Sequence, residues 1–152
     1  MSDATVGEIE NPLALEEQVC FALSVAARSV VAVYRPVLAP MGLTHPQYLV
    51  MLAMWEHEPL SVSALGRLLM LDPATLSPLL KRLEASGLLR RQRSARDERS
   101  LALVLTGRGR ELRAEAEKVP PAIVEKLGME LPELHLLHQQ LTRVIAAAAA
   151  VE

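Results

Sequence analysis

One segment of the chain, residues 72 to 105, restricts the possible folds more than any other. It opens with Asp72-Pro73, a helix N-cap followed by a proline that suits the first helical turn, and Gly87 supplies the glycine that often ends a helix. Between them, four leucines recur at helical spacing and form one apolar stripe: Leu76, Leu79, Leu80 and Leu83. Two short strands, 88–93 and 100–105, follow with a charged loop between them. A capped amphipathic helix followed directly by such a hairpin predicts a winged helix-turn-helix.

Helix signals on both sides of this segment complete the predicted fold. Thr44-His45-Pro46 opens a helix that reaches about residue 57, and Ser61 caps a short helix that precedes Asp72. A long apolar helix is predicted from the Asn11-Pro12 cap to about residue 39. After a cap at Thr106, a helix over about 107–127, kinked at Pro120-Pro121, and a last helix over about 132–149 are predicted.

The expected fold is mainly α with a small β-hairpin wing, a winged helix-turn-helix with a helical dimerisation layer from both termini. Residues 1–10 are expected to form a flexible tail, 46–106 the winged helix-turn-helix, and 11–45 with 107–152 the dimerisation region. Hydrophobic residues make up 51% of the chain, and a large subunit interface is the natural place to bury the excess.

The membrane and secretion signals of the sequence are weak. Arg28 and Arg35 interrupt the most apolar stretch, so we expect no membrane-spanning segment. The N-terminus is acidic, unlike the basic start of a signal peptide. The lone Cys20 excludes an internal disulfide and fits a reducing cytoplasm.

Charge is distributed unevenly along the chain, although the net charge is only −2. Ten Lys and Arg residues and four Asp and Glu residues lie between Leu60 and Arg110, whereas the rest of the chain has six and fourteen. A basic block within an acidic chain favours a surface that faces a polyanion, and a solvated charged face is the alternative. Because the basic block coincides with the predicted helix and hairpin, double-stranded DNA is the expected partner.

The predicted recognition helix and hairpin offer residues for each kind of DNA contact. Thr75, Ser77 and Lys81 suit base edges, and Pro78 suits a thymine methyl group. Arginines at the wing tip suit a narrow minor groove, and a nearby carboxylate can orient a guanidinium group. The residues predicted to bind DNA are Thr75, Ser77, Pro78, Lys81, Arg82, Arg93, Arg96, Asp97 as the orienting group, and Arg99.

The hairpin segments Leu88-Leu89-Arg90-Arg91-x-Arg93, Arg96-Asp97-x-Arg99 and Leu105-Thr106-x-x-Gly109 resemble the wing and following helix of the MarR family. The chain is most similar to the organic-hydroperoxide-sensing OhrR branch, of the single-cysteine type. That resemblance is carried by Cys20-Phe21-Ala22-Leu23, by Pro46-Gln47-Tyr48-Leu49 with Trp55-Glu56, and by the run from Leu71-Asp72 to Glu84.

The resemblance implies a dimeric repressor that binds a pseudo-palindromic operator and releases it when an organic hydroperoxide oxidises Cys20. It also implies that side chains of the other subunit hydrogen-bond the cysteine. The matching positions here hold Tyr34 and His45, the latter in place of a tyrosine, and a third tyrosine position holds Ser24. Since the chain has one cysteine, a sulfenic acid would have to react with a low-molecular-weight thiol, form an intersubunit product or oxidise further.

The spacing of Cys20 and Tyr34 sets a condition on such a sensor. The two residues are 14 positions apart, so they share a helix face but lie roughly 21 Å apart along the axis. They can therefore meet only if the first helices of two subunits cross antiparallel, as a two-fold dimer permits.

Four alternatives remain open at this stage. The chain could be a regulator released by a small phenolic or carboxylate ligand, with Cys20 as a structural residue. It could be a thiol peroxidase, although no activating arginine or threonine motif lies beside Cys20 and we predict no enzyme and no cofactor. It could be an interaction protein that docks a partner through its apolar helices. His135 and His138 could share a metal ion, but no ligand is fixed beside them, so we predict no metal site.

Overall fold

The computed structural model describes residues 11–94 and 99–151, and it has the mainly helical fold with a small antiparallel sheet that the sequence predicts. Short 3₁₀ helices cover Leu15–Glu17 and Ala39–Met41. The main elements in chain order are α1 (Val19–Leu38), α2 (His45–His57), β1 (Leu60–Ser61), α3 (Val62–Leu69), α4 (Pro73–Ala85), β2 (Leu89–Arg93), β3 (Leu101–Leu105), α5 (Gly107–Ala116), α6 (Val119–Leu127) and α7 (Leu131–Ala149).

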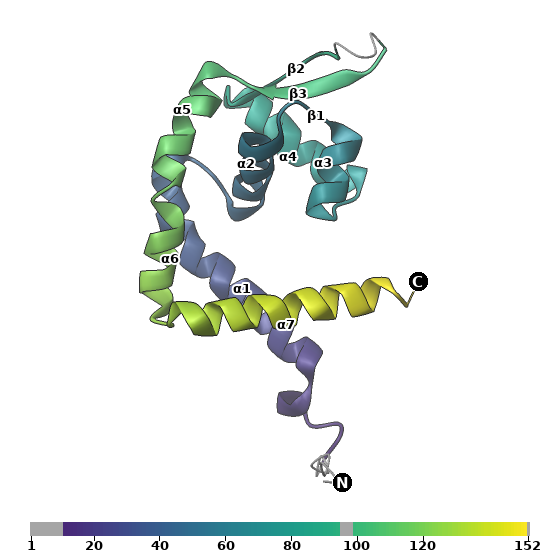
Figure 1. Cartoon of the computed structure of the whole chain (residues 1–152), viewed down its shortest axis with the longest axis vertical. Helices are drawn as coiled ribbons and strands as arrows, with labels where there is room; N and C mark the ends of the chain where they lie inside the picture. Colours follow the sequence, from purple (N-terminus) through teal and green to yellow (C-terminus); the bar gives the residue numbers. More distant parts are fainter. Residues whose placement is uncertain (1–10, 95–98, 152) are drawn as a thin grey trace.

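The sheet and three helices form the winged helix-turn-helix at one end of the molecule (Figure 1). Strands β2 and β3 pair antiparallel from Leu89 opposite Leu105 to Arg93 opposite Leu101, and the sheet order is β1-β3-β2. Helices α2, α3 and α4 lie under this sheet, while α5 and α6 lead away from it toward α1 and α7 (Figure 1). The wing and the recognition helix therefore stand apart from the long terminal helices.

Side-chain caps place the helix starts at the positions that the sequence predicts. The Ser61, Asp72 and Thr106 side chains accept hydrogen bonds from the backbone N–H groups three residues later, at 3.0, 2.7 and 3.0 Å. Thr44 forms a capping box with Gln47 at the start of α2. These caps satisfy N–H groups that have no partner inside the helix, so they set where each helix begins.

The hydrophobic core lies in the winged helix-turn-helix and continues into the corner formed by α5 and α6. It contains the four leucines of α4, the buried face of α2 and the inward side chains of β3. Helix α1 contributes only Leu38 to the fully buried set, and α7 contributes none.

The terminal helices keep much of their apolar surface exposed in the isolated subunit. Twelve of the seventeen exposed large hydrophobic residues of the described chain belong to the segments 13–25 and 129–151. The sequence predicts no membrane-spanning segment, but the 23 residues Val19–Met41 meet the length and composition criterion for one despite two arginines. This is weak evidence for a membrane span, since core helices of soluble proteins meet the same criterion.

Three details of the structure differ from the prediction. The first helix begins at Val19 instead of Asn11-Pro12, because the Asn11 side chain closes a local turn onto the Leu13 N–H and Gln18 is extended. The predicted helix over 107–127 is two helices, since Pro120 and Pro121 lie in the first turn of α6, where their missing N–H groups cost nothing. The two-residue strand β1 was not predicted, because so short a strand has no periodic pattern.

Candidate nucleic-acid interface

Helix α4 presents the polar and basic face that a recognition helix needs. Its leucines are buried, whereas Thr75, Pro78, Lys81 and Arg82 are exposed and Ser77 is partly exposed. With 13 residues, α4 is about 20 Å long, and its diameter suits the major groove of B-DNA. The structure thus brings the five residues predicted on this helix to one accessible face.

The one acidic side chain within α4 is neutralised by the wing. Glu84 Oε1 accepts a hydrogen bond from Arg91 Nε at 2.9 Å, and both side chains are only about one-third exposed or less. This ion pair joins the last turn of α4 to β2 and removes an uncompensated negative charge from the basic face.

Eight of the ten basic residues between Leu60 and Arg110 divide into two groups. Four bind groups of this chain: Arg67 donates to Ser63, Arg91 to Glu84, Arg108 to the Ser86 carbonyl and Arg110 to Glu58. Within residues 11–94 and 99–151, four others form no hydrogen bond or ion pair: Lys81, Arg82, Arg90 and Arg93. The second group remains available for phosphate groups.

The wing contributes part of the predicted contact set. Arg93 and Arg99 are exposed at the two sides of the hairpin. Arg96 and Asp97 lie outside the described residues, so their predicted roles stay predictions. Exposed Arg90 of β2 was missing from the predicted set, although its position in the arginine run was a signal for it.

Cys20 lies in the first turn of α1, far from the winged helix-turn-helix, and its side chain is exposed in the isolated subunit. Ser24, at the third tyrosine position, donates a hydrogen bond from its hydroxyl group to the Cys20 carbonyl oxygen at 2.9 Å, so this side chain is bonded within its own helix. The predicted partner Tyr34 lies near the opposite end of α1.

Tyr34 and His45 form an aromatic cluster where α1 meets α2. Their ring centroids are 4.8 Å apart in an edge-to-face arrangement, and Tyr48 lies 5.9 Å from Tyr34 and 6.4 Å from His45. Burial lowers the pKa of His45 below its ordinary value, which favours the neutral imidazole at pH 7, and burial raises the pKa of Tyr34 and of Tyr48. Tyr48 was not predicted as a site residue, although its place three residues after His45 puts both on one helix face.

A cavity of about 360 Å³ opens beside this cluster, between α2 and the α5–α6 corner. Its lining combines aromatic, apolar and charged side chains: Tyr48, Leu52, Trp55, Glu56, Arg113, Ala116, Glu117 and Pro120. Arg113 is held by Glu117 at 2.7 Å. Among the described residues, no three potential metal ligands lie close enough together to hold an ion, and the His135 ring is hydrogen-bonded to Gln139 of its own helix.

Comparison with known proteins identifies relatives of this architecture. Residues 43–101 match the model of the MarR family. The HTH-type transcriptional regulator TtmR of Methylorubrum extorquens is 46% identical over 84% of this chain. The matched region covers 66% of the length of TtmR, just under two thirds. The organic hydroperoxide resistance transcriptional regulator of Bacillus subtilis is 42% identical over 79% of this chain and 84% of its own length.

Solved structures of AbfR from Staphylococcus epidermidis are also similar. Reduced AbfR bound to DNA is 33% identical, with a TM-score of 0.70 over 89% of this chain and 94% of AbfR. The disulfide form of AbfR has a lower TM-score of 0.58 over 86% of this chain and 92% of AbfR. The fold, the basic helix and hairpin, and the relatives agree: this chain belongs to the MarR family of winged-helix, DNA-binding transcriptional regulators.

Proposed function

We propose that this regulator is a homodimeric repressor that binds a pseudo-palindromic operator and releases it when an organic hydroperoxide oxidises Cys20. The observation that carries the DNA-binding part is the outer face of α4 with β2, where basic side chains without partners in the described chain surround a helix whose one acidic residue is paired. Thr75, Ser77, Pro78 and Lys81 enter the major groove, and Arg82, Arg93, Arg96 and Arg99 contact phosphate groups or the minor groove, with Asp97 as orienting group.

A second copy of the chain is the proposed cover of the terminal helices. The segments 13–25 and 129–151 hold twelve of the seventeen exposed large hydrophobic residues of the described chain, and a two-fold dimer would bury the same residues on both subunits. An antiparallel crossing of two α1 helices brings Cys20 toward the partner subunit's Tyr34 and the partner subunit's His45. Dimerisation also spaces two α4 helices for adjacent half-sites, one helical turn of DNA apart.

The proposed redox step transfers one oxygen atom from the peroxide to sulfur. The Cys20 thiolate attacks the terminal oxygen of ROOH, the O–O bond breaks, and the alkoxide takes a proton to leave as an alcohol, so that sulfur becomes a sulfenic acid. A low-molecular-weight thiol then forms a mixed disulfide with Cys20 and releases water. The neutral form of His45 can accept or donate a hydrogen bond but brings no charge to this site.

The relatives support this chemistry without assigning it to the chain. One close relative is named for organic hydroperoxide resistance. AbfR has been solved in reduced and overoxidised forms bound to DNA, and in a disulfide form. Because overoxidised AbfR is still DNA-bound in that structure, the mixed disulfide is the product that we propose for release here.

The experiment measures affinity for a fluorescent duplex before and after cumene hydroperoxide, with and without added thiol, and determines the mass of Cys20 in the same samples. The duplex is the one that the reduced protein selects from a random pool. We expect loss of binding together with a thiol adduct on Cys20, and no release in Cys20→Ser. Release in Cys20→Ser, or an unmodified Cys20 in released protein, would contradict the proposal. Sustained peroxide consumption with excess thiol would instead favour an enzyme.

As a DNA-bound regulator, the protein is proposed to act in the cytoplasm.

The cavity beside Tyr48 supports a second candidate, a regulator released by a small phenolic or carboxylate ligand. Arg113 at its wall could receive a carboxylate in place of Glu117. Salicylate is the probe: DNA release by salicylate in Cys20→Ser, lost in Arg113→Met, would favour this candidate over the peroxide sensor.

A further inference from the structure

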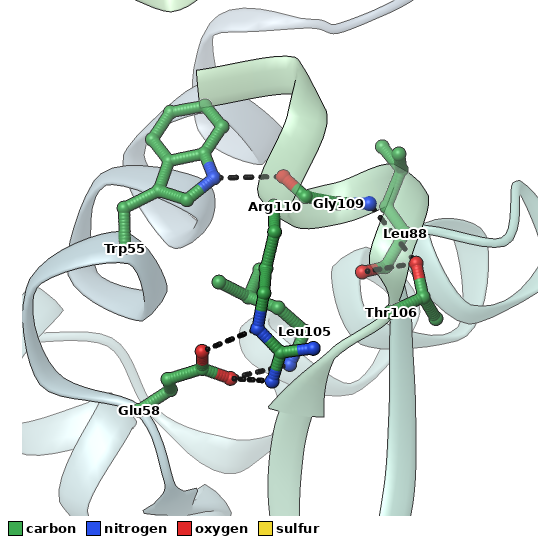
Figure 2. A network of polar contacts seen from close by, with 7 residues as sticks. All are labelled: Trp55, Glu58, Leu88, Leu105, Thr106, Gly109 and Arg110. Atoms are coloured by element: carbon green, nitrogen blue, oxygen red, sulfur yellow. Dashed lines mark hydrogen bonds and ion pairs between the residues drawn. The ribbon is translucent and has the colours of Figure 1, made fainter. Parts of the chain in front are cut away.

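A carboxylate ties the end of α2 to the sheet and to α5 (Figure 2). Glu58 directly follows α2 and binds the Arg110 guanidinium through two hydrogen bonds, Nε to Oε1 at 3.1 Å and Nη2 to Oε2 at 3.2 Å. Its Oε2 also accepts a hydrogen bond from the Leu105 N–H at 2.8 Å. Glu58 is 23% exposed, so this carboxylate is largely shielded from water.

The sheet register explains why Glu58 occupies this place. Leu60 pairs with Leu103 and Ser61 with Ala102, so a longer β1 would set residue 58 opposite Leu105. The backbone ladder does not extend that far, because β1 begins only at Leu60. The Glu58 side chain therefore supplies the acceptor that a strand backbone would otherwise give to the buried Leu105.

A second connection lies one turn earlier on α2. Trp55 Nε1 donates to the Gly109 carbonyl oxygen at 2.9 Å, while the Gly109 N–H is capped by Thr106 Oγ1 at 3.0 Å (Figure 2). A Cβ atom at position 109 would overlap the Leu88 carbonyl oxygen. The first turn of α5 thus packs directly on the backbone that follows α4.

The same turn of α5 also holds the end of the recognition helix. Thr106 Oγ1 donates to the Gly87 carbonyl oxygen at 2.6 Å, and Arg108 Nη1 donates to the Ser86 carbonyl oxygen at 3.0 Å. At its other end α5 leads into α6, which packs against α1, the helix that carries Cys20. Helix α5 therefore connects the two parts of the molecule: the chain joins it to α6, which packs on the cysteine-bearing α1, and hydrogen bonds join it to the end of α4.

We propose that Trp55, Glu58 and Arg110 form the joint that sets the angle between α5 and the winged helix-turn-helix, and through which a change in α1 and α6 reaches α4 and the wing. This inference rests on the proposed function for its trigger, the oxidation of Cys20. Trp55 and Glu58 are positioning residues: they hold α5 and touch no DNA.

The joint contains its own reporter, because Trp55 is the single tryptophan of the chain. Its indole N–H gives one NMR resonance in ¹⁵N-labelled protein, and that resonance reports the hydrogen bond to Gly109. In the wild-type protein, we expect cumene hydroperoxide with thiol to shift this resonance and to speed the exchange of the indole proton with solvent. In Cys20→Ser, the same treatment should change neither. A purely structural contact would leave the resonance unmoved while DNA is released.

Two substitutions separate positioning from direct DNA contact. Arg110→Met and Glu58→Gln both remove the ion pair, while the amide oxygen that Glu58→Gln introduces still accepts from the Leu105 N–H. Both should weaken binding of the reduced protein to its selected duplex by about three- to tenfold. The slope of log K against log salt should stay unchanged, since every side chain that binds phosphate is still present. Lys126→Met removes one charge from an exposed position on α6 and serves as the control, with the affinity of the wild-type protein.

The outcomes distinguish this inference from the proposed function. If Arg110 contacted phosphate, Arg110→Met would reduce the salt slope and Glu58→Gln would leave affinity unchanged or increase it, and the joint would be refuted. Release of DNA by peroxide with an unmoved Trp55 resonance would also refute the joint but leave the proposed function standing. Failure of peroxide to release DNA would refute the proposed function, and wild-type affinity in both variants would independently refute the joint.

Discussion

Replacing Gly109 with alanine tests how tightly the first turn of α5 is held against the segment after α4. The added Cβ would overlap the Leu88 carbonyl oxygen and would also lie 3.3 Å from a Leu105 methyl carbon. Neither neighbour can move easily, because the first is backbone and the second belongs to a side chain that is 2% exposed. The first turn of α5 must therefore shift away from the Leu88 carbonyl group and from Leu105, which disturbs the geometry of the hydrogen bonds at Gly109.

The magnitude follows from three contributions. Overpacking of this kind costs about 1 to 3 kcal/mol. Weakening the Trp55 and Thr106 hydrogen bonds at Gly109 adds about 1 kcal/mol each, at most. The higher helix propensity of alanine offsets up to about 1 kcal/mol of this loss in the free energy of unfolding. We expect the free energy of unfolding to fall by about 2 to 3 kcal/mol in Gly109→Ala.

Gly107→Ala is the matched control, because it changes the same residue type in the same turn of α5. A Cβ atom there meets nothing within 4 Å, so this variant should equal or exceed the unaltered protein in stability. Urea unfolding at one fixed protomer concentration provides the measurement, since the stability of a dimer depends on concentration. If Gly109→Ala unfolds within about 0.5 kcal/mol of Gly107→Ala, the close packing of α5 described above is wrong.

Two other predictions concern the DNA-reading surface. Lys81→Ala and Arg93→Ala should each weaken DNA binding. Each should also reduce the slope of log K against log salt by about 0.9 for every phosphate that is no longer neutralised, counted over both subunits. Lys126→Ala should change neither the affinity nor the slope, and unchanged slopes in the first two variants would show that Lys81 and Arg93 lie outside the interface. Asp72→Ala should lower stability by removing the cap on the Thr75 N–H, whereas Asp72→Asn should retain it. Hydrogen bonds from Thr75 lower the pKa of the Asp72 carboxyl. The ionised carboxylate therefore contributes its full stabilisation of the folded state above the ordinary pKa range of aspartate, and this stabilisation is lost as the pH falls through the lowered pKa. Urea unfolding between pH 7 and pH 2 should show this loss, and a pH dependence equal to that of Asp72→Asn would contradict it.

Local signals in the sequence predicted most of the fold. Caps at Ser61, Asp72 and Thr106, and the leucine stripe of α4, act over three or four residues, so one sequence is enough to read them. The start of α1 could not be predicted in the same way. Asn11 has the residue type of an N-cap, but its side chain closes a turn that ends after two residues.

Long-range contacts limited the prediction of the site. The arginine run predicted a basic surface, but its division between DNA and internal partners depends on Glu58 and Glu84, which lie 52 and 7 residues from the arginines that they bind. The same limit applies to Trp55, whose partner Gly109 is 54 residues away. The predicted pairing of Cys20 with groups of a second subunit depends on two chains and stays a prediction.

Strand β2 lies at the margin of the sheet, with one side of its backbone unpaired, and such a strand can recruit a strand of another molecule and begin aggregation. Its last four residues are Arg90, Arg91, Gln92 and Arg93, all exposed. Arg91 is paired with Glu84, but when two free hairpins approach side by side the like charges of Arg90 and Arg93 repel and oppose intermolecular sheet growth. Neutral substitutions here should therefore lower solubility in low salt as well as affinity for DNA.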